Sequence, residues 1–231
     1  MSNLINYTLH LADNALILGQ RNTEWCGHGP ILEQDIAITN ISLDLVGQAR
    51  SFYQYAAQLK ADDSTEDMLA YFRTERDFKN CLLVEQPNGD WAQTILRQFL
   101  FSSYQYFLYQ ELQKNSDETL AAIAEKSLKE VSYHLRWSSE WVIRLGDGTD
   151  ESHSRILKAI DELWRYTGEL FIPVEYEKEA GVDVSLLKND WSEKVKAVLT
   201  EATLPVPENI FMQTGGKTGT HTEHLGYILT E

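Results

Sequence analysis

Cysteine, proline and glycine are all scarce in this sequence. Of its 231 residues, two are Cys, five are Pro and 13 are Gly. Two cysteines, Cys26 and Cys81, are too few for a disulfide framework or a zinc cluster in a chain of this length, and they favour a reducing compartment. We therefore expect a cytoplasmic protein. We also expect the long stretches without Pro or Gly to be helical.

Basic residues are too few to balance the acidic ones. The chain has 20 Lys and Arg against 35 Asp and Glu, which gives a net charge of −15. Such a surface repels polyphosphates, so nucleic acid is not an expected partner. The sequence has no apolar run of about 18 residues and no basic segment before an apolar one, so we expect neither a transmembrane helix nor a signal peptide. With 43% hydrophobic residues, the chain can still build the core of one domain over residues 1–231.

Helical periodicity is what the sequence has in abundance. Apolar residues recur every three or four positions over residues 4–20, 31–59 and 117–145, and no segment alternates as a strand would. The interpretation is an all-α bundle of long antiparallel helices, with a less regular C-terminal segment from about residue 203. Further helices are predicted over residues 65–86, 90–114, 149–170 and 185–201 and from about residue 221, with a linker over 173–184. Capping residues are expected at Ser64, Asp90 and Thr149.

The predicted helix over residues 90–114 carries six Phe and Tyr residues, spread over all of its faces. Such a helix must be covered all round, either by other helices of the chain or by a second subunit. Two interpretations stay open. In the first, Phe101 and Tyr104 lie near an interface with a partner subunit, because aromatic residues are enriched at interfaces. In the second, the same side chains fill the core of the chain itself.

Two segments approach the pattern by which helical bundles hold a pair of metal ions. The pattern is Glu-x-x-His, which places a carboxylate and an imidazole on one face of a helix. The candidate segments are residues 44–48, DLVGQ, and residues 130–134, EVSYH. Both lie against the apolar stripes of their helices. Asp44 and Glu130 are four residues, rather than three, before the last position of their segments.

Neither segment has the carboxylate that the pattern requires. Leu45 stands three residues before Gln48, and Val131 stands three residues before His134. One imidazole is also replaced by an amide, which is a weak neutral ligand. We therefore interpret Gln48 and His134 as buried polar residues that are hydrogen-bonded inside the bundle.

Three other motifs are weaker. Residues 214–218, TGGKT, look like the end of a phosphate-binding loop, but Phe211 stands where the first glycine belongs and no strand precedes it, so we reject that function. Residues 221–224, HTEH, are interpreted as one face of a helix end rather than as a metal chelate. Cys26 with His28 would need a third, orienting group to act as a nucleophile, and a buried cysteine is the favoured interpretation.

Seven segments together resemble a known family, the C subunits of the ring 1,2-phenylacetyl-CoA epoxidase. The resemblance follows the chain in order over almost its whole length and implies a ferritin-like bundle within the multicomponent oxygenase of aerobic phenylacetate degradation. The segments are RNTEWCGHGP (residues 21–30), LDLVGQAR (43–50), LVEQPNGD (83–90), RQFLF (97–101), KEVSYHLR (129–136), LGDGT (145–149) and HTEHLG (221–226).

The resemblance also implies what the missing carboxylates mean. In this family the catalytic A subunit is a related bundle with two Glu-x-x-His motifs and a di-iron centre, and the C subunit resembles a sister copy that has lost the ligands. Leu45, Gln48 and Val131 stand at lost positions, and His134 alone matches. Glu24, and Ser102 or Ser103, align with the two remaining single-carboxylate positions.

By this resemblance the chain has no catalytic residue, cofactor or metal of its own. The reaction of the complex is NADPH-dependent epoxidation of the phenylacetyl-CoA ring with O₂. The di-iron centre is expected in the partner subunit, and FAD and an iron–sulfur cluster are expected in the reductase. The implied partners are the catalytic A subunit and the other subunits of the complex, while a homodimer of the isolated chain stays open. The alternatives are an interaction scaffold unrelated to oxygenation and a self-sufficient di-iron oxidase that uses Glu24, Asp44, Glu130 and His134.

Overall fold

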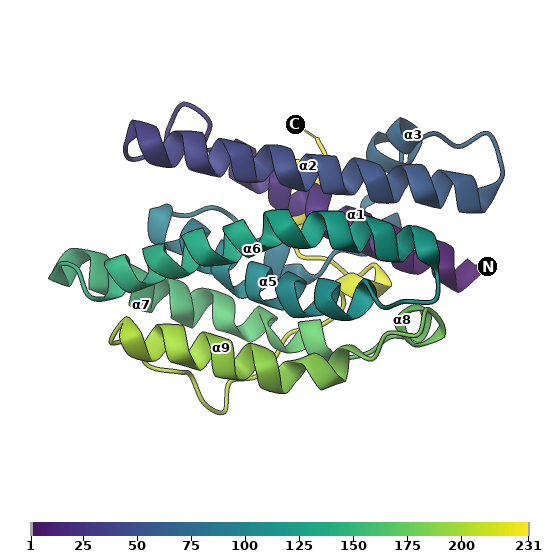
Figure 1. Cartoon of the computed structure of the whole chain (residues 1–231). Helices are drawn as coiled ribbons and strands as arrows, with labels where there is room; N and C mark the ends of the chain where they lie inside the picture. The colour runs from purple at the N-terminus through teal and green to yellow at the C-terminus, as the bar shows by residue number, and fades with distance from the viewer. Residues whose placement is uncertain (1, 231) are drawn as a thin grey trace.

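The computed structural model describes residues 2–230, and its regular structure is helical throughout this range (Figure 1). Four long helices form two hairpins. The first hairpin pairs α1 (Ser2–Thr23) with α2 (Leu32–Lys60), and the second pairs α5 (Trp91–Leu112) with α6 (Glu118–Gly146). The all-α prediction is confirmed, and the two paired hairpins are the arrangement expected for a ferritin-like bundle.

The second hairpin is covered on both sides. Helix α6 lies along α2 on one side, and α7 (Asp150–Leu163) and α9 (Lys188–Glu201) pack on α5 and α6 on the side away from α2 (Figure 1). The short helices are α3 (Glu66–Tyr71), α4 (Leu82–Glu85), α8 (Glu175–Glu179) and α10 (Glu223–Ile228). The 3₁₀ turns are η1 (Glu75–Asp77), η2 (Trp164–Tyr166), η3 (Gly168–Phe171), η4 (Val184–Leu187) and η5 (Gly216–Thr218). None of the helices within residues 2–230 combines the length and the apolar character needed to span a membrane.

Helix starts follow the capping chemistry of the sequence. The side chain of Asp90 accepts a hydrogen bond from the backbone N–H of residue 93 at 3.1 Å, and that of Thr149 accepts one from residue 152 at 3.2 Å, so both predicted caps are confirmed. The cap predicted at Ser64 is wrong by one residue. Thr65 occupies that position and accepts from the N–H of residue 68 at 3.2 Å.

The continuous helix predicted over residues 65–86 is wrong. The segment breaks into α3, η1 and α4, with an extended stretch before α4. In that stretch the backbone N–H groups of residues 79, 81 and 82 donate to the buried side chains of Asp13, Asn14 and Glu169, each at 2.8 Å. These tertiary hydrogen bonds replace the intrahelical ones, which is why the helical periodicity of the segment does not decide its structure.

The C-terminal third is less helical than expected. The helix predicted to run to about residue 170 ends as an α-helix at Leu163 and continues as η2 and η3. The predicted linker over residues 173–184 contains α8, and the helix predicted from residue 185 is η4 followed by α9. From residue 203 to the start of α10, the regular structure consists of η5 alone.

The aromatic residues of α5 fill the core of the chain itself. Phe101 and Tyr104 are each 1% exposed, and the ring of Tyr104 packs edge-on against Phe171 with 5.9 Å between ring centroids. The interpretation that these two residues face a partner subunit is therefore wrong. The half-buried aromatic residues of the same helix are Trp91 at its start and Tyr106 and Phe107 near its end.

Candidate functional site

The polar residues singled out on the second and fifth predicted helices meet along the seam between α2 and α6. The ring of His134 is fully buried, and its Nε2 lies 3.0 Å from Oδ2 of Asp44. One turn further along, Nε2 of Gln48 donates to Oε2 of Glu130 at 2.9 Å. The structure thus gathers these four side chains as two hydrogen-bonded pairs.

The positions of the missing carboxylates are apolar and sealed. Leu45 and Val131 have no exposed surface. Around them the network continues through neutral groups: the hydroxyl of Tyr109 donates to Oε1 of Gln48 at 3.4 Å and accepts from Nε2 of Gln105 at 3.3 Å. Burial raises the pKa of Tyr109, so its hydroxyl keeps its proton. Leu45 and Val131 therefore offer no oxygen ligand, and amide and phenol groups continue the hydrogen-bonded network beside them.

The imidazole of His134 offers one free nitrogen. Nε2 lies against Asp44, whereas Nδ1 has no hydrogen-bond partner among the described residues. The side chain of Asp44 is 36% exposed, so water reaches its carboxylate. The pair resembles half of a ligand set, with an oriented imidazole and a carboxylate that water reaches, but no third His, Cys, Asp or Glu joins them within residues 2–230.

The side chain of Glu24 makes its hydrogen bonds away from this seam. It follows α1, and its carboxylate accepts from Nη1 of Arg21 at 2.8 Å and from Nδ2 of Asn88 at 2.7 Å. Between residues 2 and 230, no three His, Cys, Asp or Glu side chains are grouped closely enough to hold a metal ion. The four residues of the self-sufficient oxidase, which include Asp44 and Glu130, are therefore not gathered into one ligand set.

Ser102 and Ser103 are both buried on α5. Oγ of Ser102 accepts from Nε2 of Gln98 at 2.7 Å, and Oγ of Ser103 donates to the carbonyl of residue 99 at 2.8 Å. Oε1 of Gln98 in turn accepts from Nδ2 of Asn22 at 2.6 Å. Neutral hydroxyl and amide groups are again hydrogen-bonded to one another at the position that aligns with a single carboxylate.

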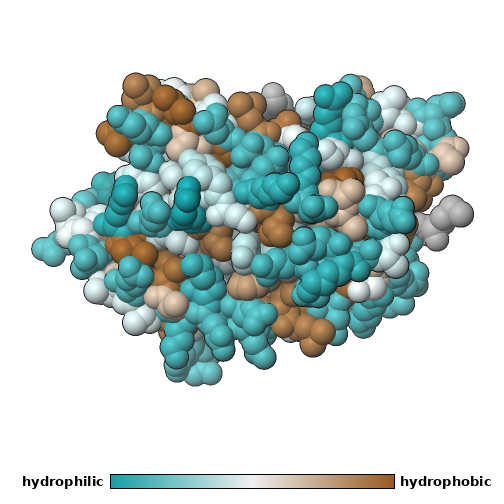
Figure 2. Space-filling model, viewed as in Figure 1, coloured by the Kyte–Doolittle hydropathy of each residue, from teal (hydrophilic) through white to brown (hydrophobic). Residues whose placement is uncertain are grey.

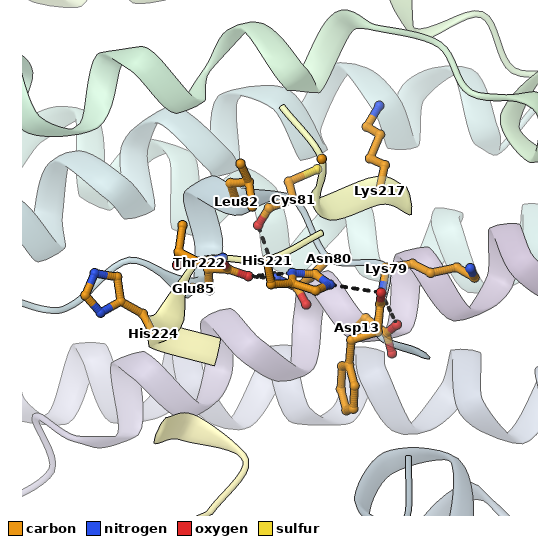
Figure 3. A network of polar contacts seen from close by, with 12 residues as sticks. Asp13, Lys79, Asn80, Cys81, Leu82, Glu85, Lys217, His221, Thr222 and His224 are labelled. Carbon is orange, nitrogen blue, oxygen red and sulfur yellow. Dashed lines mark hydrogen bonds and ion pairs between the residues drawn. The ribbon is translucent and has the colours of Figure 1, made fainter. Parts of the chain in front are cut away.

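A second polar centre lies where the C-terminal segment crosses α4, and Figure 3 shows it from close by. At the middle of this centre lies the carboxylate of Glu85, which is fully buried. Its Oε1 accepts from the backbone N–H and the hydroxyl of Thr222, at 2.6 and 2.7 Å. Its Oε2 accepts from Nδ1 of His221 and Nδ2 of Asn80, both at 2.8 Å. These four donors use the full accepting capacity of a carboxylate.

The geometry fixes the charge of His221. Its Nδ1 faces the carboxylate of Glu85, and its Nε2 lies 3.0 Å from the carbonyl oxygen of Phe78 (Figure 3). Both partners are acceptors, so both ring nitrogens must donate and the ring is an imidazolium. Burial by itself lowers the pKa of His221, but the hydrogen bond and the charge of Glu85 outweigh it and raise the pKa above its ordinary value.

Lys217 supplies a second buried ion pair next to this centre. Its Nζ donates to Oε1 of Glu177 at 2.8 Å, and the two side chains are 2% and 0% exposed. The remaining two ammonium hydrogens have acceptors in the carbonyl oxygens of residues 170 and 172, at 3.3 and 3.2 Å. All three donors of the ammonium group are therefore used within the chain.

The loop TGGKT (residues 214–218) does bind an anionic group, but this group is a side chain of the same chain. The backbone N–H groups of Gly215 and Lys217 donate to Oε1 of Glu169, at 2.8 and 3.3 Å. Consecutive N–H groups in such a turn form a small anion-binding concavity. Because Glu169 fills this concavity and Lys217 is already paired, the rejection of a phosphate-binding loop has a structural reason.

The two weaker motifs do not assemble either. His221 points into the network with Glu85, whereas His224 points away from it (Figure 3), so the two rings do not face one metal ion. Cys26 is exposed and Cys81 is buried, so the expectation of a buried cysteine is wrong for Cys26. The ring of His28 contacts the backbone carbonyl of Cys26 at 3.2 Å.

The acidic half of the second centre escaped prediction from the sequence. Glu85, Glu169 and Glu177 are fully or almost fully buried, yet nothing near them in the sequence separates them from surface glutamates. Their basic partners Lys217 and His221 lie inside the two motifs considered above for ligand binding. The one feature of the sequence that pointed to this centre was therefore a pair of basic residues, Lys217 and His221, in an acidic chain. The sequence around them did not indicate which acidic residues they contact.

Comparison with known proteins places these features in a family. The family described as "Phenylacetic acid catabolic protein" matches residues 1–231. A protein of Escherichia coli (strain K12), named as the C subunit of 1,2-phenylacetyl-CoA epoxidase, is 50% identical over 236 residues, an alignment that covers 100% of this chain and 95% of the relative.

Proposed function

Since the chain belongs to the phenylacetic acid catabolic protein family, we propose that it is a non-catalytic, structural subunit of a multicomponent 1,2-phenylacetyl-CoA epoxidase. The observation that carries this proposal is the 50% identity over the full chain to the C subunit of such an enzyme. The apolar residues Leu45 and Val131, buried where ligand carboxylates would stand, support the non-catalytic role.

In this proposal the partner is the catalytic subunit, which holds the di-iron centre, while FAD and the iron–sulfur cluster belong to the reductase. The charge of the chain agrees with this division. A net charge of −15 is unfavourable for binding the phosphates of a coenzyme A ester, so that ligand is better held by another subunit. We also propose a cytoplasmic location, which suits two cysteines that are both free.

The proposed role is to stabilise the partner by covering its surface. A related bundle that has lost its metal ligands can still pack its helices against those of a catalytic subunit. Binding of this kind stabilises the folded partner by mass action, without any chemistry in the chain that binds. At the seam between α2 and α6, Gln48 donates directly to Glu130, so these two side chains need no metal to be paired.

Iron content tests this proposal directly. After anaerobic loading with Fe(II) and desalting, the chain alone should retain well below one equivalent of iron, whereas the complex with the catalytic subunit should retain about two. Epoxidation of phenylacetyl-CoA should require both subunits and should persist when His134 of this chain is replaced by Gln. About two irons in the chain alone, or loss of epoxidation in a folded His134→Gln complex, would contradict the proposal.

A further inference from the structure

A pocket lies where α3 and η1 meet the start of α1, away from both polar centres described above. Its volume is about 490 Å³, which is within the range of pockets that hold small molecules. The first turns of α1, the end of α2 and residues 64–79 supply its lining. Figure 1 shows α3 at the same end of the bundle as the N-terminus. We call this the α1–α3 pocket.

One part of the α1–α3 pocket is apolar and open to solvent. Met68 and Phe72 line it, and their side chains are 46% and 80% exposed, whereas Leu9 and Leu69, which also line it, are buried. Hydrophilic side chains cover most of the face of the molecule seen in Figure 2, so large exposed apolar groups are not typical of this surface. Exposed apolar side chains in a concave surface are characteristic of a site for the hydrocarbon part of a ligand.

The other part of the pocket is basic, although the chain has a net charge of −15. Four basic residues belong to the lining: Lys60, Arg73, Arg76 and Lys79. The one acidic residue of the lining is Asp77, and its Oδ2 already accepts from the N–H and the hydroxyl of Thr74, at 3.0 and 2.7 Å. The pocket therefore concentrates positive charge on a surface that is otherwise acidic.

Two of the four cations are neutralised within the chain. Nη1 of Arg73 donates to the buried carboxylate of Asp13 at 3.1 Å. Nζ of Lys60 lies 3.4 Å from Oδ2 of Asp62. These two residues therefore add little net charge to the pocket.

Arg76 and Lys79 are the cations that remain. Neither forms an ion pair with an acidic residue of the part of the chain that the structure describes. Figure 3 shows the side chain of Lys79 extending away from Glu85 and His221, and its Nζ lies 5.8 Å from the ring centre of Tyr176. Two unpaired cations beside an apolar surface are complementary to a ligand that is anionic at one end and apolar at the other.

A second pocket of similar size has the opposite charge. It lies beside η4 with a volume of about 480 Å³, and its lining includes Glu111, Asp183 and Asp190. Lys114 is the one basic residue of that lining, and its Nζ lies 2.8 Å from Oε1 of Glu111. An anion is therefore repelled there and attracted to the α1–α3 pocket, although the two volumes are alike.

From these observations we propose that the α1–α3 pocket binds a small amphipathic monocarboxylate, in which one carboxylate is joined to an apolar body about as large as a phenyl ring. Arg76 and Lys79 bind the carboxylate, because a planar guanidinium matches its two oxygens and an ammonium group adds a second charge. Met68 and Phe72 contact the apolar body. A polyanion is the poorer ligand, because Asp77 and the net charge of the chain oppose further negative charge. This site belongs to the chain alone and does not rest on the proposed function.

Calorimetric titration of the full chain with phenylacetate and with octanoate tests the proposal. At low ionic strength we expect dissociation constants below about 1 mM, an affinity within reach of ligands with about ten non-hydrogen atoms. Acetate lacks the apolar body, and 2-phenylethanol lacks the charge. Each should therefore bind at least about ten-fold more weakly than phenylacetate.

Two variants assign the binding to this pocket. Arg76→Gln should weaken binding of phenylacetate at least about ten-fold, because it removes a charge-assisted hydrogen bond. The matched control Arg136→Gln removes another exposed arginine and changes the net charge equally, so it should bind as the wild type does. Phe72→Ala should weaken binding about three-fold or more, because apolar contact is lost. Both Arg76 and Phe72 are exposed, so the melting temperature of each variant should stay within about 2 °C of the wild type.

Four results would overturn the proposal. The first is no binding of either acid at about ten times the expected dissociation constant. The second is equal binding by Arg76→Gln and the wild type, and the third is displacement of phenylacetate by acetate at equal concentration. The fourth is loss of binding when the catalytic subunit is added, which would show that a partner fills the pocket. None of these results depends on iron content or on epoxidation, so the proposed function stands or falls separately.

Discussion

The two polar centres of this chain differ in how fully their central side chains are hydrogen-bonded and buried. At the C-terminal segment, Glu85 accepts four hydrogen bonds and Lys217 uses all three of its donors, with almost no exposed surface on either. At the seam between α2 and α6, Nδ1 of His134 and Oε1 of Gln105 have no partner among the described residues, and Asp44 is 36% exposed. The residues of the metal-binding pattern thus lie in the less tightly bonded centre, while glutamates outside any motif form the anionic part of the more tightly bonded one.

The largest effect should come from breaking the buried ion pair at the C-terminal segment. Lys217→Met keeps most of the volume of the side chain but leaves the carboxylate of Glu177 buried without its cation. We expect a loss of about 3–5 kcal/mol in the free energy of unfolding, measured by urea denaturation. The control is Lys114→Met, which removes the exposed pair with Glu111 and should change stability by less than about 0.5 kcal/mol. Equal effects of the two substitutions would contradict the structural role of Lys217.

The second-largest loss of stability should come from Glu85→Gln. The substitution keeps the shape of the side chain, but its NH₂ group faces donors from Asn80, His221 or Thr222 whichever way the amide is turned. We expect a loss of about 2–4 kcal/mol, because a charge-assisted bond is removed and a donor is left opposite a donor. The double variant Glu85→Gln with His221→Gln should lose less than the sum of the two single variants, since the residues are coupled. Simple additivity would show that the two side chains do not interact.

A pH titration should separate two of the buried histidine rings, those of His221 and His10. The pKa of His221 is raised in the folded chain, so its contribution to stability is complete below its unfolded pKa of about 6.5 and is lost as the pH rises through the folded value. Burial first, and then the charge of Lys217, lower the pKa of His10 to about 3. Stability linked to His10 is therefore complete above about pH 6.5 and falls as the pH drops toward 3. His221→Gln should abolish the loss at high pH and His10→Gln the loss at low pH, and NMR of the ring nitrogens should show His221 charged and His10 neutral at pH 7.

The smallest effect should come from the seam. His134→Leu removes one hydrogen bond to a carboxylate that water can reach, and it also removes the unpartnered Nδ1. We expect a loss of less than about 1 kcal/mol, because no buried charge is left behind. Thermal unfolding of His134→Leu beside Lys217→Met compares the two centres on the same scale. A loss at the seam as large as that at Lys217 would show that the seam is as tightly coupled to folding as the C-terminal segment.

Local periodicity predicted the long helices well because their burial pattern is local. The apolar stripe of α2 contains Ile38, Ile41 and Leu45, which are fully buried, and the spacing of these residues already places them on one face. The helix predicted over residues 65–86 includes residues 79–82, which have a different structure. Their backbone donors are satisfied by Asp13 and Asn14, more than 60 residues earlier, and by Glu169, more than 80 residues later. No rule based on spacing within a helix can identify such partners.

At the candidate site, too, the local sequence predicted some features, whereas others depend on contacts between distant segments. The sequence placed Gln48 and His134 on helix faces turned toward the apolar stripes, and it showed that two carboxylates of the metal-binding pattern are absent. It did not show that His134 pairs with Asp44 across the seam, or that Gln48 pairs with Glu130, because both contacts depend on the packing of α2 against α6. For Phe101 and Tyr104 it left two interpretations open, and the packing around α5 decided between them.

The sequence by itself determined the all-α class, the long helices, the caps at Asp90 and Thr149, and the resemblance to the epoxidase family, because propensity, periodicity and motif identity act over short stretches of chain. Tertiary structure alone decided which charges are buried. Glu85 and His221 are 136 residues apart, and each is unfavourable in the core without the other. Their burial therefore depends on chain segments that meet only in the folded molecule.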